Sequence, residues 1–298
     1  MSDAAAGALL SGLVDYAGLF PPAALSMDAA ALEYARWRRA PEAFMLGRFV
    51  APAARLAELG RAAEALLPQP GAGEPWHVSA LIGTDASGDA ALVRPFNAAY
   101  AGRAAVDSVE LKAATPAEAE ASLGGLPAGL TAYVEIAPDD TLAPMLAALK
   151  RRGARAKIRT GGVVPTAIPE PRDVARFIAA CAEAGVPFKA TAGLHHPVRA
   201  EQALTYELAS PRAVMHGFLN VFAAAVFARA GADSAQLEAV LRETQPSAFR
   251  FDASSLSWRE LRATSQALEA TRRDLASSFG SCSFAEPVAD LRALGVLP

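Results

Sequence analysis

The chain has 298 residues, of which 52% are hydrophobic, and its formal net charge at pH 7 is -3. This length and apolar content fit one large α/β barrel or two ordinary domains, and the charge does not favour a nucleic-acid-binding surface. The N-terminus, MSDAAAG, has no positive cluster, and no apolar run approaches the roughly 20 residues that cross a bilayer. We therefore expect a cytoplasmic protein without nucleic-acid or membrane partners.

Strand-like segments alternate with helical patterns along the whole chain, which predicts a parallel α/β architecture. The predicted strands are residues 13–20, 44–50, 77–82, 106–113, 131–137, two strands that begin near Lys157 and Phe188, and 248–252. A helix is predicted from Pro171 to Ala184, with Gly185 as its C-cap. Eight such units match a closed (β/α)8 TIM barrel, and a doubly wound open sheet is the alternative. Neither a Gly-x-Gly-x-x-Gly nor a Walker-type phosphate loop occurs.

We expect residues 1–298 to form a single domain, because no low-complexity linker or short internal repeat interrupts the pattern. Long helical patterns over about 199–246 predict a helical insertion between strands 7 and 8. Residues 276–298 are predicted to be a C-terminal tail. The alanine-rich helices are compatible with a homodimer.

Alternation along four predicted strands places charged side chains on the face opposite the helices. On the fourth strand, for example, Val109 and Leu111 share one face, while Glu110 lies on the other. Burial of charges is costly unless they pair, so a charged barrel interior at the strand ends favours a functional site. The predicted interior holds six ionisable residues, namely Glu110, Lys112, Glu135, Lys157, Arg159 and Lys189.

Lysine is rare in this chain, and its positions are informative. Only four of the 28 basic residues are lysines, namely Lys112, Lys150, Lys157 and Lys189, and three of them lie on predicted strands. Arginine can replace a solvated lysine, but it cannot replace a lysine that must lose its proton. A lysine crowded by other cations is a usable nucleophile toward carbonyl groups. These positions therefore point to amine-based chemistry.

Two of these lysines lie in segments that resemble deoxyribose-phosphate aldolase. Residues 157–161 (KIRTG) resemble the Lys-x-x-Thr-Gly strand of that family, whose lysine forms the Schiff base. Residues 188–193 (FKATAG) resemble its next strand, whose lysine perturbs the first. Weaker similarity covers residues 13–16 (LVDY), the fifth strand at Val134-Glu135, and residues 249–256 (FRFDASSL), which resemble the eighth-strand Arg-Phe-Gly-Ala-Ser-Ser motif. The resemblance implies a class I aldolase-like barrel.

The chain departs from that family where a substrate phosphate would bind. Asp252 replaces the glycine of the eighth-strand motif, and a carboxylate there would repel phosphate. His195 and His196 stand in place of the compact loop that follows the seventh strand. The family's fourth-strand aspartate aligns with Asp107, whereas strand alternation points Glu110 inward instead. We therefore expect a non-phosphorylated substrate.

The preferred function is a Schiff-base-forming lyase, of aldolase or retro-aldolase type, that needs no cofactor and acts on a small carbonyl or carboxylate compound. Lys157 would be the nucleophile and Lys189 its perturber, while Glu135, Glu110 and Lys112 complete the catalytic candidates. The substrate-binding candidates are Arg159, Asp15, Thr191, His195, His196, Asp252, Asn220 and Cys282.

Two alternatives remain open from the residues alone. One is a metal-assisted lyase or hydrolase, whose ligands would come from Glu110, Glu135, His195, His196 and His216, although no metal site is predicted. Adjacent histidines on a strand are a poor chelate, because their rings point apart. The other is a non-catalytic barrel that binds a small anion, with the lysines as counter-ions.

Overall fold

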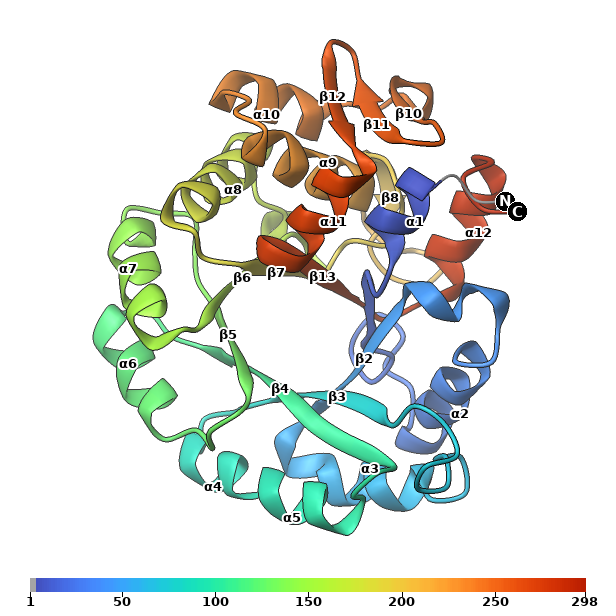
Figure 1. The fold of residues 1–298 in the computed structure, drawn as a ribbon, viewed down its shortest axis with the longest axis vertical. Coiled ribbons are helices and arrows are strands. Elements are labelled where there is room, and N and C mark those ends of the chain that lie inside the picture. The colour runs from blue at the N-terminus through green and yellow to red at the C-terminus, as the bar shows by residue number, and fades with distance from the viewer. Residues whose placement is uncertain (1–3) are drawn as a thin grey trace.

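Eight parallel strands close into a barrel in the computed structural model, which describes residues 4–298 (Figure 1). The barrel strands are β1 (Val14–Tyr16), β2 (Leu46–Pro52), β3 (Trp76–Leu81), β4 (Ala104–Lys112), β5 (Thr131–Glu135), β6 (Arg155–Arg159), β7 (Phe188–Thr191) and β13 (Ala276–Ser281). Neighbours round the barrel follow chain order, and β13 pairs with both β7 and β1. The predicted (β/α)8 TIM barrel is confirmed.

Helices surround the barrel, as the alternating pattern predicted (Figure 1). They are α1 (Ala4–Leu10), α2 (Met27–Trp37), α3 (Leu56–Ala63), α4 (Ala86–Ala91), α5 (Val93–Ala99), α6 (Pro116–Gly124), α7 (Leu142–Arg152), α8 (Pro171–Ala184), α9 (Phe218–Arg229), α10 (Ser234–Arg242), α11 (Ser265–Asp274) and α12 (Ala285–Ala293). None of these helices, over residues 4–298, is both long and apolar enough to cross a membrane.

Helix α8 shows how local sequence sets the bounds that position the site. Pro171 occupies its first turn, where the missing N–H costs nothing, and Gly185 ends it in the left-handed region at φ 64°. These are the bounds predicted from the sequence. The helix buries Phe177, whose ring meets Phe188 of β7 edge-on at 5.4 Å. This packing fixes β7 beside β6, so that the two lysine-bearing strands are neighbours.

The predicted eighth strand at residues 248–252 is wrong, because a later segment closes the barrel. Residues 249–251 form β10 in a separate three-stranded antiparallel sheet with β11 (Ser255–Trp258) and β12 (Leu261–Thr264). The true eighth strand, β13, lies in the predicted tail, which ends in α12. Its sequence, ASSFGS, lacks the apolar alternation expected of a strand, because Ser278 bonds to an interior carboxylate while Phe279 stacks on Phe218 of α9.

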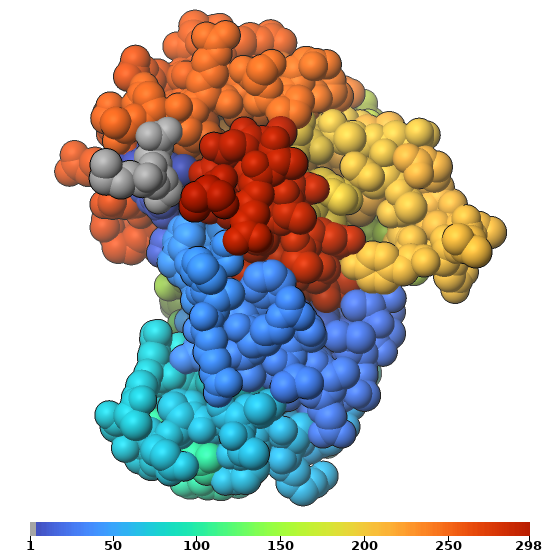
Figure 2. All heavy atoms as spheres, turned by 90° about the vertical axis from the view of Figure 1, so that its right-hand side faces the viewer, coloured from blue at the N-terminus to red at the C-terminus, as the bar shows by residue number. Residues whose placement is uncertain are grey.

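The segment between β7 and β13 contains more than the predicted helical insertion. The range 199–246 does hold α9 and α10, but it opens with a two-stranded hairpin, β8 (Ala200–Ala203) and β9 (Arg212–Met215). Helix α9 is apolar all round because it is enclosed by α8, α10 and α11. Figure 2 shows the part of the chain that includes the hairpin, in yellow, projecting from the body of the molecule.

The small-residue turns that follow β6 and β7 pack against each other backbone to backbone. A Cβ atom added at Gly161 would lie 2.9 Å from the Cα of Gly193, and one added at Gly193 would lie 2.8 Å from the Cα of Gly161. The Thr160 hydroxyl donates to the carbonyl oxygen of Ala192 at 2.7 Å, which ties the two turns together. Glycine is required here by space, and this contact holds the ends of β6 and β7 in one place.

We expect Gly161→Ala to destabilise the protein by about 1–3 kcal/mol, because the neighbouring turn is backbone and cannot move aside cheaply. Urea-induced unfolding followed by circular dichroism measures this change. Gly7→Ala in α1 is the matched control, since its added Cβ meets nothing within 4 Å and should stabilise the helix by roughly 0.5–1 kcal/mol. Equal stability of Gly161→Ala and wild type would show that the close approach imposes no constraint.

Candidate active site

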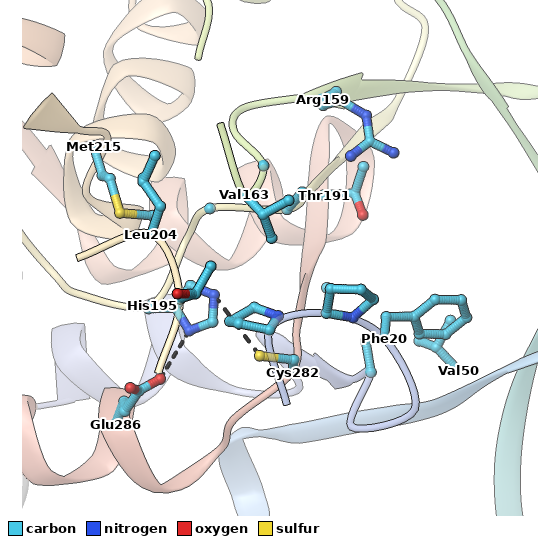
Figure 3. A pocket seen from close by; sticks show the side chains of 18 of the residues that line it. Phe20, Val50, Arg159, Val163, Thr191, His195, Leu204, Met215, Cys282 and Glu286 are labelled. Atoms are coloured by element: carbon cyan, nitrogen blue, oxygen red, sulfur yellow. Dashed lines mark hydrogen bonds and ion pairs between the residues drawn. The ribbon is translucent and has the colours of Figure 1, made fainter. Parts of the chain in front are cut away.

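A cavity of about 420 Å³ opens at the C-terminal ends of the barrel strands. Every barrel strand contributes a residue near or just after its C-terminal end, which is where active sites of this fold are built. These eight lining residues are Ala17, Val50, Leu81, Lys112, Glu135, Arg159, Thr191 and Cys282. Figure 3 shows part of the lining, with Arg159 and Thr191 near one end and His195, Cys282 and Glu286 together at another.

Four of the predicted interior charges occupy one level of the barrel. The strand register aligns Lys112 with Glu135, Glu135 with Lys157, and Lys157 with Lys189 across β4 to β7. Side chains at one register level of parallel strands point the same way. The alternation argument therefore placed these side chains on the correct face.

Lys189 is fully enclosed by acidic partners. Its Nζ lies 2.6 Å from the Asp15 Oδ2 atom and 2.6 Å from the Glu110 Oε1 atom. The ring of Tyr133 lies 5.3 Å from the same nitrogen. Burial alone would lower the pKa of Lys189, but the two carboxylates more than offset burial and raise it above its ordinary value. Lys189 is therefore a fixed ammonium group.

Lys157 lies between two carboxylates and faces the cavity. Its Nζ is 3.0 Å from the Glu110 Oε2 atom and 3.0 Å from the Glu135 Oε2 atom. The residue is only 4% exposed, yet it lines the cavity together with Glu110 and Glu135, whereas Lys189 and Asp15 do not. Of the two buried lysines, Lys157 is the one that a small molecule in the cavity can reach.

Glu110 joins the two lysines and is held as an anion. Burial opposes its charge, but Lys189 and Lys157 outweigh burial and hold the Glu110 pKa below its ordinary range. The Ser79 hydroxyl donates a further hydrogen bond to it at 2.8 Å. The sequence predicted that the two lysines would repel each other directly, but the structure places the Glu110 carboxylate in contact with both of them.

The outer part of the site is more exposed. Arg159 Nε and Lys112 Nζ each lie 3.3 Å from the Glu135 Oε1 atom, and their side chains are 44% and 70% exposed. Burial raises the pKa of Glu135, but Lys157 and Arg159 outweigh burial and lower it overall. Arg159 and Lys112 are thus cations at the mouth of the cavity rather than buried groups, and both can meet an anionic substrate.

Three predicted substrate-binding residues lie outside the cavity lining. Asp252 belongs to the small outer sheet, where it bonds to Ser255 and Arg262. Asn220 is fully buried in α9 and donates to the carbonyl oxygens of Val240 and Glu243, so it fastens α9 to the end of α10. These two predictions are wrong, because the first followed the misplaced strand and the second is a packing contact. Asp15 is in the interior, but it binds Lys189.

The aspartate that aligns with the family's fourth-strand residue also lies elsewhere. Asp107 accepts from Arg48 at 2.7 Å and contacts His77 at 2.9 Å, away from the cavity lining. The β3–β4 register shifts at this point, since Val78 pairs with Val106 and Ser79 pairs with Ser108. This irregularity leaves Asp107 out of the ladder, and alternation from Ser108 onward then places Glu110 inside.

The histidines do not converge on one point. His195 Nδ1 lies 2.8 Å from Glu286, and His196 Nδ1 lies 2.6 Å from Asp290. His216 is buried against the Pro169 carbonyl oxygen, and burial lowers its pKa to about 4. Across residues 4–298, no three His, Cys, Asp or Glu side chains are placed to hold a metal ion. This arrangement does not favour the metal-assisted alternative.

Several contributing residues escaped the sequence argument. Ser79 and Ser278 bond to Glu110 and Asp15 from β3 and β13, but a serine on a strand carries no signal by itself. Glu286 lies on α12 and contacts His195, and Tyr206 lies in the loop of the β8–β9 hairpin and contacts both Cys282 and Glu286. The signal that was missed is the pattern from residue 276 onward, where a strand and then a helix follow α11.

Comparison with known proteins gives no family for this chain. No protein-family model matches the sequence, and no curated protein matches it. Function is therefore argued from the side chains in the barrel.

We expect Glu110→Gln to destabilise the protein by about 3–5 kcal/mol, because it leaves two buried ammonium groups without their shared partner. Since the folded-state pKa of Glu110 is depressed, its stabilisation is present at neutral pH and is lost as the pH falls below about 4, where the unfolded glutamate takes up a proton. Wild type should thus lose more stability than the variant on acidification.

Urea unfolding at neutral and acidic pH measures both effects, and Glu260→Gln at an exposed position is the matched control. A Glu110→Gln protein as stable as Glu260→Gln would contradict the central position given to Glu110.

Proposed function

We propose that the protein is a Schiff-base-forming lyase of aldolase or retro-aldolase type, with Lys157 as the nucleophile. One observation carries this proposal: Lys157 is a buried amine that lines the cavity and lies between two carboxylates, whereas Lys189 is shielded from the cavity. A nucleophilic lysine needs a nearby group to take its proton, and Glu135 at 3.0 Å can do so.

In the proposed reaction, Lys157 passes a proton to Glu135 and attacks the substrate carbonyl carbon. The resulting carbinolamine loses water when Glu135 returns the proton to the departing hydroxyl group, which leaves an iminium ion. Cleavage of the bond between the α and β carbons leaves its electron pair as the C=C bond of an enamine, the iminium π electrons move to nitrogen, and a carboxylate accepts the proton of the β-hydroxyl group, which becomes the carbonyl of the leaving fragment. Protonation and hydrolysis of the enamine restore the amine. No oxidant or reductant is consumed.

Lys189 has a supporting role in this scheme. Its ammonium group is bonded to Asp15 and Glu110, which keeps it charged and prevents it from competing as a nucleophile. Lys189 also holds the Glu110 carboxylate, whose other oxygen contacts Lys157, and so helps to position the Lys157 amine. Lys189 thus acts on Lys157 through Glu110 and not by direct repulsion between the two amines, so its role is that of a positioning residue.

The cavity suits a small substrate that carries a carboxylate. Arg159 and Lys112 stand at the mouth and offer cationic partners, and arginine can bind a carboxylate through two parallel hydrogen bonds. Asp252 lies outside the cavity, so its carboxylate does not bear on whether the substrate carries a phosphate.

The resemblance to deoxyribose-phosphate aldolase supports the same assignment of roles. The two lysines that the resemblance pairs lie opposite each other on neighbouring strands. Residues 249–256, which resemble the eighth-strand motif, lie in the small outer sheet and not in the barrel. Only the resemblance at β6 and β7 therefore supports the proposal.

We expect borohydride to trap an adduct on Lys157 when the protein is incubated with propanal or pyruvate, because the reductant fixes an iminium as a stable amine. Peptide mapping by mass spectrometry locates the adduct. Lys157→Arg should lose the adduct and lower turnover of any cleaved substrate by roughly 1,000-fold or more.

Lys150→Arg is the matched control, because Lys150 lies on the outer helix α7 and donates to the Ala184 carbonyl oxygen. An adduct on Lys189 in place of Lys157 would overturn the assignment of roles. Stabilisation of the protein by pyruvate without any trapped adduct would instead support the anion-binding alternative.

A further inference from the structure

A second group of reactive side chains lies in the same cavity, and the lyase scheme does not use it. The Cys282 Sγ atom lies 4.0 Å from His195 Nε2, and the opposite ring nitrogen, Nδ1, lies 2.8 Å from the Glu286 Oε2 atom (Figure 3). Cys282 is 6% exposed and His195 is 9% exposed, and all three residues line the cavity. The thiol, the imidazole and the carboxylate therefore lie in a row in space, with the imidazole in the middle, as in enzymes that use a nucleophilic cysteine.

Each member comes from a different part of the chain, and each is fixed by its own contacts. Cys282 directly follows β13, His195 follows β7, and Glu286 lies in the first turn of α12. Tyr206, from the hairpin loop, donates to Glu286 at 3.1 Å, and its hydroxyl lies 3.7 Å from the Cys282 sulfur. A cysteine that only filled space would not need a histidine whose far nitrogen is held by a carboxylate.

His195 carries a positive charge beside the cysteine sulfur. Burial alone would lower the pKa of the His195 imidazole, but its contacts with Cys282 and Glu286 outweigh burial and raise it to about 9. His195 is therefore an imidazolium at neutral pH, and its Nε2 atom lies on the side of the Cys282 sulfur. The other titratable groups around the cluster are Tyr206, Tyr16 and His196. Burial is the largest cause that raises the pKa of both tyrosines, and His196 contributes to lowering the pKa of Glu286.

We propose that Cys282, His195 and Glu286 form a second nucleophilic site, which takes an aldehyde as a thiohemiacetal. The sulfur adds to the carbonyl carbon, the C=O π electrons move to oxygen, and that oxygen receives the proton from His195 Nε2. One S–C bond and one O–H bond form, and nothing is oxidised or reduced. Glu286 holds Nδ1 throughout, so the ring keeps Nε2 directed toward the sulfur.

An aldehyde fits this site better than an ester. Acyl transfer needs further donors for the oxyanion of its tetrahedral intermediate. The amide that follows Cys282 is already engaged, because the Ser283 N–H donates to the Ser281 hydroxyl at 3.4 Å, and the Glu286 N–H donates to Ser283. Addition to an aldehyde needs one proton, and His195 supplies it. The proposal does not depend on Lys157 acting as the Schiff-base lysine.

The reactivity of the thiol is tested by alkylation with iodoacetamide at neutral pH, followed residue by residue with mass spectrometry. Cys282 should react, and His195→Gln should slow its reaction by roughly tenfold or more, because the imidazolium is lost. Cys181 is the internal reference, since it is fully buried in α8 and burial raises its pKa far above the ordinary range. Equal rates for Cys282 in wild type and His195→Gln would overturn the proposal.

The substrate class is tested by protection with propanal, with propan-1-ol as the control that lacks an electrophilic carbon. Propanal should slow alkylation of Cys282 in Lys157→Arg as well as in wild type, and dilution should restore the rate. Carbon-13-labelled propanal should show a thiohemiacetal signal in wild type that Cys282→Ser lacks, which keeps the test valid if Lys157→Arg does not fold. Protection that requires Lys157, or absence of the signal, contradicts the thiol site but leaves the Schiff-base proposal standing.

Discussion

Both buried lysines of the barrel depend on one carboxylate. Glu110 binds Lys189 through one oxygen and Lys157 through the other. Buried ammonium and carboxylate groups are tolerated only when each is paired, because a buried charge without a partner costs several kcal/mol. Asp15 and Glu135 complete the set at its two ends. The barrel interior therefore holds an alternating row of charges, and of its two buried amines Lys157 is the one that lines the cavity.

Closure of the barrel is what brings this chain of charges together. Asp15 on β1 and Lys189 on β7 are 174 positions apart, and they meet because β13 lies between those two strands. Ser278 of β13 donates to the same Asp15 oxygen that binds Lys189. The strand with the weakest sequence pattern thus supplies a hydrogen bond to Asp15, at one end of this row of charges. Cys282, the proposed second nucleophile, directly follows that strand and lines the same cavity.

The sequence was sufficient for the barrel and for the inward side chains of β4 to β7, because alternation on a strand is fixed by the backbone. It failed at the eighth strand, since FRF at residues 249–251 looks more like a strand than ASSFGS does. That error carried Asp252 into the predicted site and left Glu286 out of it. The sequence also could not predict which charged side chains pair. That Glu110, rather than a second cation, contacts Lys157 follows only from the folded structure.

The most direct test of this account is the titration of the lysine side chains by NMR. With only four lysines, selective carbon-13 labelling and single Lys→Arg variants can assign each signal. The account predicts that Lys189 stays protonated beyond the ordinary lysine pKa of about 10.4, because Asp15 and Glu110 hold its charge. Titration of Lys189 below that value would contradict the account, since Lys189 would then be the better nucleophile.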